Sequence, residues 1–156
     1  MKRRNKILAL TLLSVLLMTA LAGCGGKPFT MNDVPVYPGA REAAPGDSEM
    51  ADMMLTLLEG GMQEVASGSG VEITSFETKL YLLPTDVNWA QVRDFYNSEL
   101  ANTDWKLDAD FTEDSDFFSS LGWLRGSGNN EQALFVVYTQ DPIAGSAFLI
   151  VMLISE

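Results

Sequence analysis

The sequence predicts an α+β domain in which an antiparallel sheet of about four to five strands carries two helices on one face. Two segments, residues 48–65 and 85–100, have apolar residues at spacings of three and four, the period of an amphipathic helix. Beyond residue 104, the chain consists of short alternating or continuously apolar runs separated by turns. The order helix, strand, helix and then several strands therefore favours helices packed on an antiparallel sheet.

The folded part is expected to begin as an extended segment, residues 34–40. Pro35 and Pro38 disfavour helix there. Pro38 followed by Gly39 predicts a tight turn at the end of this segment.

A helical insertion is expected at about residues 41–70, with one amphipathic helix of about four turns. Asp47 or Ser48 would cap its N-terminus, and Gly60-Gly61 would weaken or bend it late. Its apolar stripe consists of Met50, Met53, Met54, Leu57, Leu58, Met62 and Val65.

Residues 71–83 are expected to form a long strand, because apolar and polar residues alternate from Phe76 onward and Pro84 stops the run. Thr85-Asp86 then supplies a cap for the second helix. Its apolar stripe consists of Trp89, Val92, Phe95, Tyr96 and Leu100.

Further strands are expected from residue 105, at 117–125, at 133–139 and at 147–154, with an acidic loop through Asp116 after the first. The last run, Ala147 to Ile154, is almost continuously apolar. Such a run indicates a central strand or a strand covered on both faces.

The N-terminus reads as a secretory signal that is removed from the mature protein. Basic residues at Lys2, Arg3, Arg4 and Lys6 precede an apolar run from Ile7 to Ala22. This run is shorter than the ~20 residues that span a bilayer comfortably.

Leu21-Ala22-Gly23-Cys24 closes that signal and contains the only cysteine of the chain. It resembles a bacterial lipobox. The resemblance implies cleavage between Gly23 and Cys24, a diacylglycerol on the Cys24 thiol and an extracytoplasmic domain anchored to lipid at the cell membrane or the outer membrane. Gly25 at the next position resembles the outer-membrane sorting signal of bacteria that have two membranes.

Removal of residues 1–23 leaves a tether at 24–33 and one domain at 34–156. Of the 10 basic residues, 4 leave with the signal, so the mature charge is 6 − 21 = −15. A surface of that sign repels nucleic acid, which we exclude as a partner. With one cysteine the exported chain forms no internal disulfide, so its stability depends on its apolar core.

A second resemblance rests on Tyr37-Pro38-Gly39-Ala40, on Phe95-Tyr96 with Leu100, and on Trp105. These residues are similar to a "YPGA" turn, an "FYxxxL" helix and a Trp-bearing strand in a module of small exported bacterial lipoproteins. The resemblance implies an α+β fold in the cell envelope and names no catalytic residue. The insertion at 41–70 departs from it. Physically, the same aromatic residues are also those that a helix needs to pack on a sheet.

The residues for common catalytic chemistry are sparse. The chain has no histidine, which removes the usual general base near neutral pH and the commonest metal ligand. No serine lies in a G-x-S-x-G pattern. We therefore expect a protein that is not an enzyme and has no cofactor, with a hydrolase based on two carboxylates as the distant alternative.

Two clusters are candidate binding sites. The first is a weak set of Ca²⁺ ligands without the EF-hand spacing, for which a solvated acidic loop is the simpler interpretation; it consists of Asp108, Asp110, Glu113, Asp114 and Asp116. The second is a methionine-rich surface that packs in the core, binds a partner or ligand, or binds Cu(I); it consists of Met50, Met53, Met54, Leu57 and Met62.

These features predict a membrane-tethered, extracytoplasmic, non-enzymatic module that binds or assembles with other envelope components. Its expected partners are membrane lipid, through acylated Cys24, and an unknown envelope protein. The alternative is a small hydrophobic ligand or lipid held in a pocket between the methionine-rich helix and the sheet.

Overall fold

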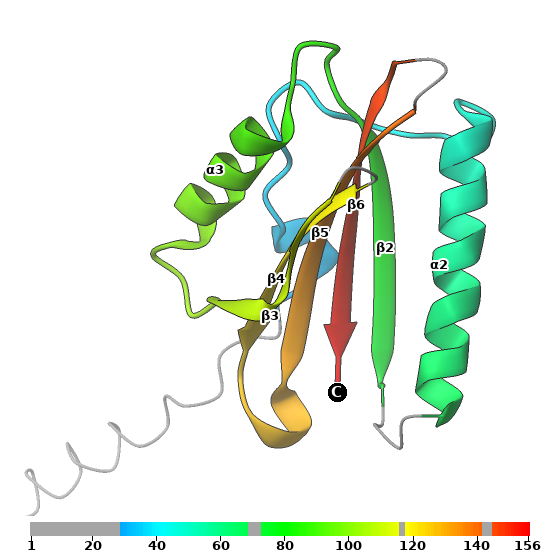
Figure 1. The fold of residues 1–156 in the computed structure, drawn as a ribbon. Helices are drawn as coiled ribbons and strands as arrows, with labels where there is room; N and C mark the ends of the chain where they lie inside the picture. Colours follow the sequence, from blue (N-terminus) through cyan, green and yellow to red (C-terminus); the bar gives the residue numbers. More distant parts are fainter. Residues whose placement is uncertain (1–28, 69–72, 116–117, 142–144) are drawn as a thin grey trace, which may run out of the picture.

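The computed structural model describes residues 29–68, 73–115, 118–141 and 145–156. A six-stranded antiparallel sheet in the order β1-β2-β6-β5-β4-β3 lies between two helices (Figure 1). The elements are η1 (Met31–Asp33), β1 (Arg41–Glu42), α2 (Glu49–Gly68), β2 (Ser75–Leu82), α3 (Trp89–Leu100), β3 (Lys106–Asp114), β4 (Phe118–Arg125), η2 (Gly128–Asn130), β5 (Gln132–Gln140) and β6 (Ala147–Ser155).

The sheet has six strands, so the predicted four to five was wrong. The added strand is β1, whose two residues pair with Leu82 and Tyr81 of β2. It follows the predicted Pro38-Gly39 turn, in which Gly39 has φ +79° and the Ala40 N–H donates to the Tyr37 carbonyl at 3.0 Å. A strand of two residues carries no periodicity, so the sequence pattern could not reveal it.

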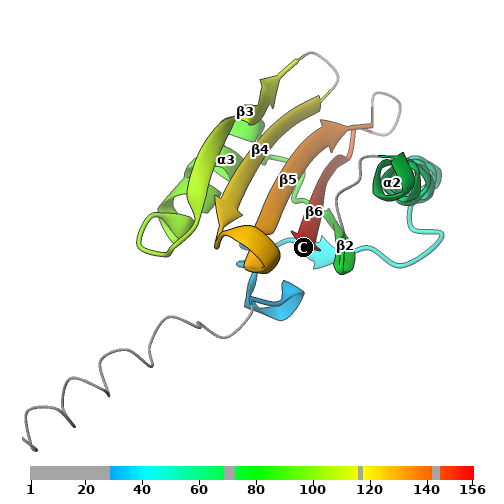
Figure 2. The ribbon, with the colours of Figure 1, turned by 90° about the horizontal axis from the view of Figure 1, so that it is seen from below.

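The two helices lie on opposite faces of the sheet, so the predicted placement on one face was wrong (Figure 2). The cause is visible in β6, a central strand with apolar side chains on both sides. Leu149, Val151 and Leu153 join the core under α3, which we call face A. Phe148, Ile150 and Met152 join the core under α2, which we call face B. Because both faces of β6 are apolar, each needs a cover.

Face A is covered by α3, which buries Val92, Tyr96 and Leu100 against the sheet. The helix begins at Asn88 rather than at the predicted cap Thr85-Asp86. The Asn88 side-chain oxygen accepts from the Gln91 N–H at 3.1 Å, and the Gln91 side-chain oxygen accepts from the Asn88 N–H at 2.9 Å. This reciprocal capping box satisfies backbone donors that the first helical turn leaves free.

Tyr96 is fully buried on face A, and among the described residues its hydroxyl has no hydrogen-bond partner. A buried unpaired hydroxyl costs about 1–3 kcal/mol. We therefore expect Tyr96→Phe to raise the free energy of unfolding by about 1 kcal/mol, since the hydroxyl is removed and the ring stays. Chemical denaturation at neutral pH measures this change, and a loss of stability would contradict it.

Burial also raises the pKa of Tyr96 above its ordinary value of 10.0, with a smaller contribution from Tyr81. Above pH ~10 the unfolded chain loses the phenolic proton first, so this residue's contribution to stability is full below that pH and falls as pH rises. Between pH 8 and pH 11, the free energy of unfolding should therefore fall further in the wild type than in Tyr96→Phe. The upper limit, pH 11, lies about one unit above the pKa of a tyrosine in the unfolded chain.

Residues that the sequence assigned to the tether also pack on the domain. Phe29 and the buried Met31 belong to the face A core, and the Phe29 ring meets the Trp105 ring edge-on at 5.3 Å. The buried Gln132 side chain accepts from the Phe29 N–H at 3.2 Å and donates to its carbonyl at 2.9 Å. The folded part therefore includes Phe29, which lies five residues before Val34, the predicted first residue of the domain.

Candidate binding surface

Helix α2 covers only one side of face B. Ser48, one of the two predicted caps, precedes the helix, and its hydroxyl oxygen accepts a hydrogen bond from the Ala51 N–H at 3.3 Å. Ala51 is buried over Leu80 of β2 and Phe148 and Ile150 of β6. The adjoining half-buried residues of the helix are Met50, Met54, Leu55 and Leu58. The β2–β6 side is therefore covered, and the β5–β4–β3 side of face B has no helix above it in the described part of the chain (Figure 2).

Apolar side chains occupy this uncovered side. Phe135 and Val137 of β5 are half-buried, and Phe118 of β4 is 39% exposed. By strand pairing, Phe118, Ser120 and Gly122 lie on the same face as Val137 and Phe135. An exposed aromatic residue of this kind is informative when it lies in a continuous apolar patch.

A bulge in edge strand β3 adds an aromatic ring to this patch. Asp108 pairs with Gly122 and Glu113 pairs with Ser120, so four residues of β3 stand opposite one of β4. The bulge places Phe111 over Gly122, where its ring meets the Phe135 ring edge-on at 5.0 Å. Phe111 is nevertheless 42% exposed. Bulges at sheet edges commonly redirect a side chain in this way.

One flank of α2 lies away from the β1 edge of the sheet. Asp52 and Leu55 line a small pocket together with Glu42 to Pro45, which lie beside β1 at the edge of the sheet. At 100° per residue, Met53 and Leu57 lie on about the opposite side of the helix from Leu55. They are 56% and 66% exposed. The methionine-rich flank therefore faces away from the β1 edge.

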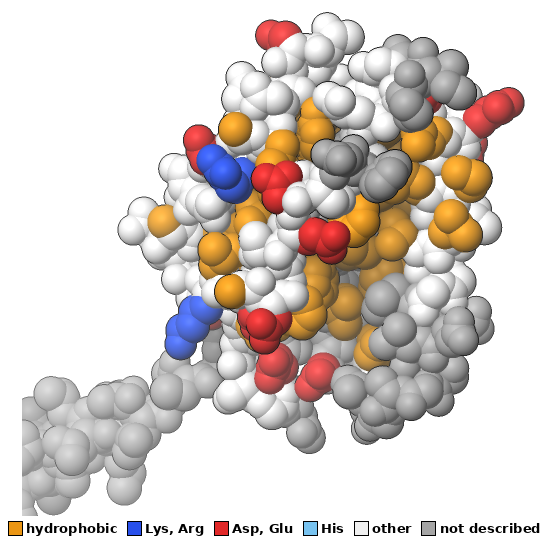
Figure 3. All heavy atoms as spheres, in the orientation of Figure 1, with side chains coloured by type: hydrophobic (Ala, Val, Ile, Leu, Met, Phe, Trp, Pro, Cys, Tyr) orange, Lys and Arg blue, Asp and Glu red, His pale blue; other side chains and the backbone are white. Residues whose placement is uncertain are grey.

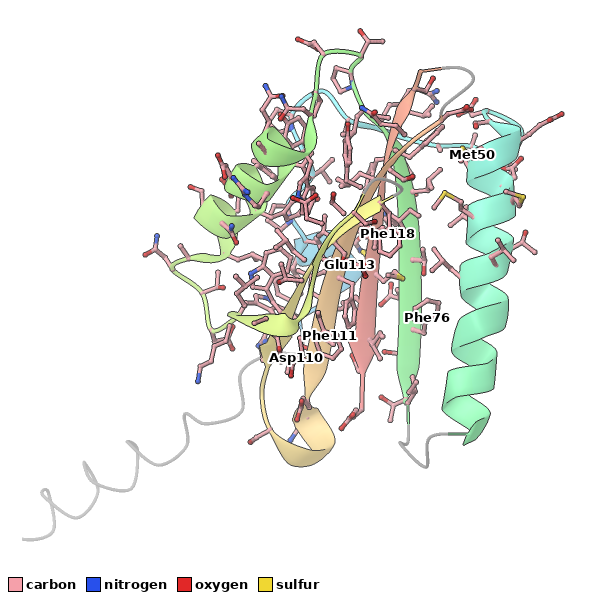
Figure 4. All side chains as sticks on the ribbon, in the orientation of Figure 1. Met50, Phe76, Asp110, Phe111, Glu113 and Phe118 are labelled. Atoms are coloured by element: carbon pink, nitrogen blue, oxygen red, sulfur yellow. The ribbon has the colours of Figure 1, made fainter. Side chains whose placement is uncertain are left out.

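We call the region between α2 and β3 the apolar groove. Its floor is apolar where β4 and β5 pass, and carboxylates stand along the β3 side (Figure 3). Met50, Phe76, Asp110, Phe111, Glu113 and Phe118 surround it (Figure 4). Its described apolar members are Met50, Met54, Phe76, Phe111, Phe118, Phe135 and Val137.

The predicted methionine-rich surface is therefore divided in two. Met50 and Met54 are half-buried against the sheet, whereas Met53 and Leu57 are exposed. Met62 lies in α2, and its side chain is outside the described residues. Phe111 and Phe118 were not among the predicted site residues. The sequence signal available for Phe111 was its position between Asp110 and Glu113.

The predicted acidic loop is part of strand β3 as far as Asp114 and then continues into Ser115. Because side chains alternate in a strand, β3 separates carboxylates that are close in sequence. Asp114 lies on face A and accepts from the Ser119 hydroxyl at 2.8 Å, whereas Glu113 pairs with Ser120 on face B. Asp116 is outside the described residues. Among the residues described, no group of three or more His, Cys, Asp or Glu side chains could hold a metal ion.

Two further pockets are open to solvent. One has a volume of about 180 Å³ and lies between α2 and β2; Thr78, whose buried hydroxyl oxygen has no partner within the described ranges, lines it. The other measures about 540 Å³ and lies near Lys106, Leu107 and Arg125. Arg125 is engaged there by Asp104 at 3.1 Å and by the rings of Phe29 and Trp105, each 5.4 Å away. Neither pocket coincides with the apolar groove.

Comparisons with known proteins yield one similar solved structure to report, LpqN of Mycobacterium tuberculosis, described as involved in cell envelope biogenesis. It shares 16% sequence identity, with a TM-score of 0.36, over 83% of this chain and 86% of that chain. No family model and no curated protein matches this chain. Within the described ranges, no helix has the length and hydropathy needed to cross a bilayer.

Proposed function

We propose that this chain is a lipid-anchored, extracytoplasmic, non-enzymatic binding module of the cell envelope and that it binds through the apolar groove. The observation that carries the proposal is the uncovered side of face B, where two aromatic rings, Phe111 and Phe118, remain about 40% exposed. Solvent-exposed aromatic residues beside a half-buried apolar floor are typical of protein-binding surfaces.

The anchoring part of the proposal rests on the sequence. The lipobox-like Leu21-Ala22-Gly23-Cys24 supports attachment to lipid at the cell membrane or the outer membrane. Only four residues separate Cys24 from Phe29, which is hydrogen-bonded to Gln132, and this supports a domain held close to that membrane.

Site-specific photo-crosslinking in the native host tests the binding role. A photoreactive residue at Phe118 should form an adduct, whereas the same residue at Ser98, exposed on α3 over the other face, should form none. Mass spectrometry then distinguishes the occupants. A polypeptide adduct supports the binding module, and an adduct of lipid mass supports the alternative of a small hydrophobic ligand. Equal adducts at both positions, or none at Phe118, would reject the groove as the binding surface.

A further inference from the structure

The apolar groove has the width of one α-helix. Strands in a sheet lie about 4.8 Å apart, so the region above β5 and β4 lies about 10 Å from the region above β2 and β6. Two packed helices have their axes 8–10 Å apart, and helix α2 already occupies the β2–β6 side. A helix laid above β5 and β4 would contact Phe135, Val137 and Phe118 below it and the flank of α2 beside it.

The β3 side of the groove is acidic, and the α2 side contributes no basic residue. Helix α2 contains no basic residue, and its described residues toward the groove are Met50 and Met54, whereas Asp52 lines the pocket beside β1. Strand β3 contains four acidic residues, of which Asp114 lies on face A and the other three are Asp108, Asp110 and Glu113; its one basic residue is Lys106 at its first position. Strand β4 carries Arg125, which is engaged by Asp104 and by two rings of the face A core.

We propose that the apolar groove binds a cationic amphipathic helix of a partner protein. Its apolar face would cover Phe111, Phe118 and Phe135, and its Lys or Arg residues would approach Asp110 and Glu113. The inference rests on the proposed function and specifies the chemistry of the partner. Charge disfavours two other occupants: a second copy would bring equally acidic surfaces together, and anionic lipid or a fatty acid would place its charge among carboxylates.

Synthetic helices test the charge requirement directly. Three peptides of about 18 residues, roughly the 27 Å length of β4, would share one Leu pattern at helical spacing and carry Lys, Gln or Glu at the polar positions. Each labelled peptide is titrated with the full chain in phosphatidylcholine nanodiscs, and fluorescence anisotropy is read against empty nanodiscs. We expect the Lys peptide to bind at least about tenfold more tightly than the Glu peptide, with weaker binding at higher salt.

Matched variants assign the effect to the groove. Asp110→Asn with Glu113→Gln should weaken Lys-peptide binding by about threefold or more. The control, Asp86→Asn with Glu99→Gln, makes the same change in net charge at exposed positions away from the groove and should leave binding unchanged. Phe118→Ser should weaken binding of every peptide. Circular dichroism of each variant checks that the fold is kept.

The outcomes separate the inference from the proposed function. If all three peptides bind equally and Phe118→Ser weakens them, the groove binds apolar helices and the inference of a cationic partner is overturned. Equal losses in the groove variant and the control variant would also overturn it. If no peptide binds and Phe118 gives no photo-adduct, the proposed function fails as well.

Discussion

Cys24→Ala is expected to abolish lipid attachment and to leave residues 1–23 uncleaved. Cys24 is the only thiol of the chain, so no other residue can accept the thioether-linked diacylglycerol. Each buried methylene contributes about 0.8 kcal/mol to membrane binding, so two or three acyl chains amount to an effectively permanent anchor. Intact mass spectrometry of the protein from its host's envelope should show acyl mass and loss of residues 1–23 in the wild type, and neither in the variant.

The control for this experiment is Gly26→Ala, which changes a residue just beyond the cleavage site and keeps the thiol. It should be processed and acylated as the wild type is. A Cys24→Ala protein that lacks residues 1–23 and still sediments with the membrane would reject the lipid anchor.

The proposed anchor at Cys24 would have a structural consequence, because few residues separate it from the sheet. Four residues separate Cys24 from Phe29, which is fixed to the sheet by Gln132. At about 3.4 Å per residue, lipidation of Cys24 as proposed would keep Phe29 within about 17 Å of the acylated residue. Gln132 pairs with Ser155, so the proposed anchor would hold the start of β5 and the end of β6 near the membrane.

Periodicity predicted the class of the fold and most of its elements, because apolar burial determines those residues. Helix α3 was predicted over residues 85–100 and is formed by Trp89–Leu100, and the turn at Gly39 is also present. The continuous apolar run of β6 indicated a central strand or a strand covered on both faces, and β6 is both. Placing both helices on one face conflicted with that same observation.

The groove was harder to predict because it depends on irregular structure. Acidic residues in β3 suggested a solvated loop, and no period in the sequence reveals a bulge between Asp108 and Glu113. The bulge alone brings Phe111 over the sheet. Gly122 lies within β4, inside the strand expected at 117–125, and its lack of a side chain leaves space for that ring.

Gly122→Ala is expected to destabilise the domain and to open the groove. A Cβ at this position would lie 2.5 Å from the Phe111 Cβ and 3.2 Å from Phe135 Cδ1. Because the first contact involves an atom attached directly to the backbone, β3 itself has to move. Overpacking of this kind typically costs about 1–3 kcal/mol, measurable by denaturant unfolding. The matched control is Gly60→Ala in α2, where the added Cβ has nothing within 4 Å and should stabilise the helix by about 0.5–1 kcal/mol.

A double-mutant cycle with Phe111→Gly shows whether the cost arises from the Phe111 contact. If the bulge side chain is what the new methyl group meets, Gly122→Ala should cost at least about 1 kcal/mol less in the Phe111→Gly background. Equal costs in both backgrounds would instead assign the effect to Phe135 or to the β4 backbone. The displacement of β3 in Gly122→Ala would also move Phe111 out of the groove. Gly122→Ala should therefore reduce photo-crosslinking from a photoreactive residue at position 118, whereas Gly60→Ala should leave it unchanged. A destabilised variant with undiminished crosslinking would show that the glycine serves packing and that Phe111 takes no part in binding.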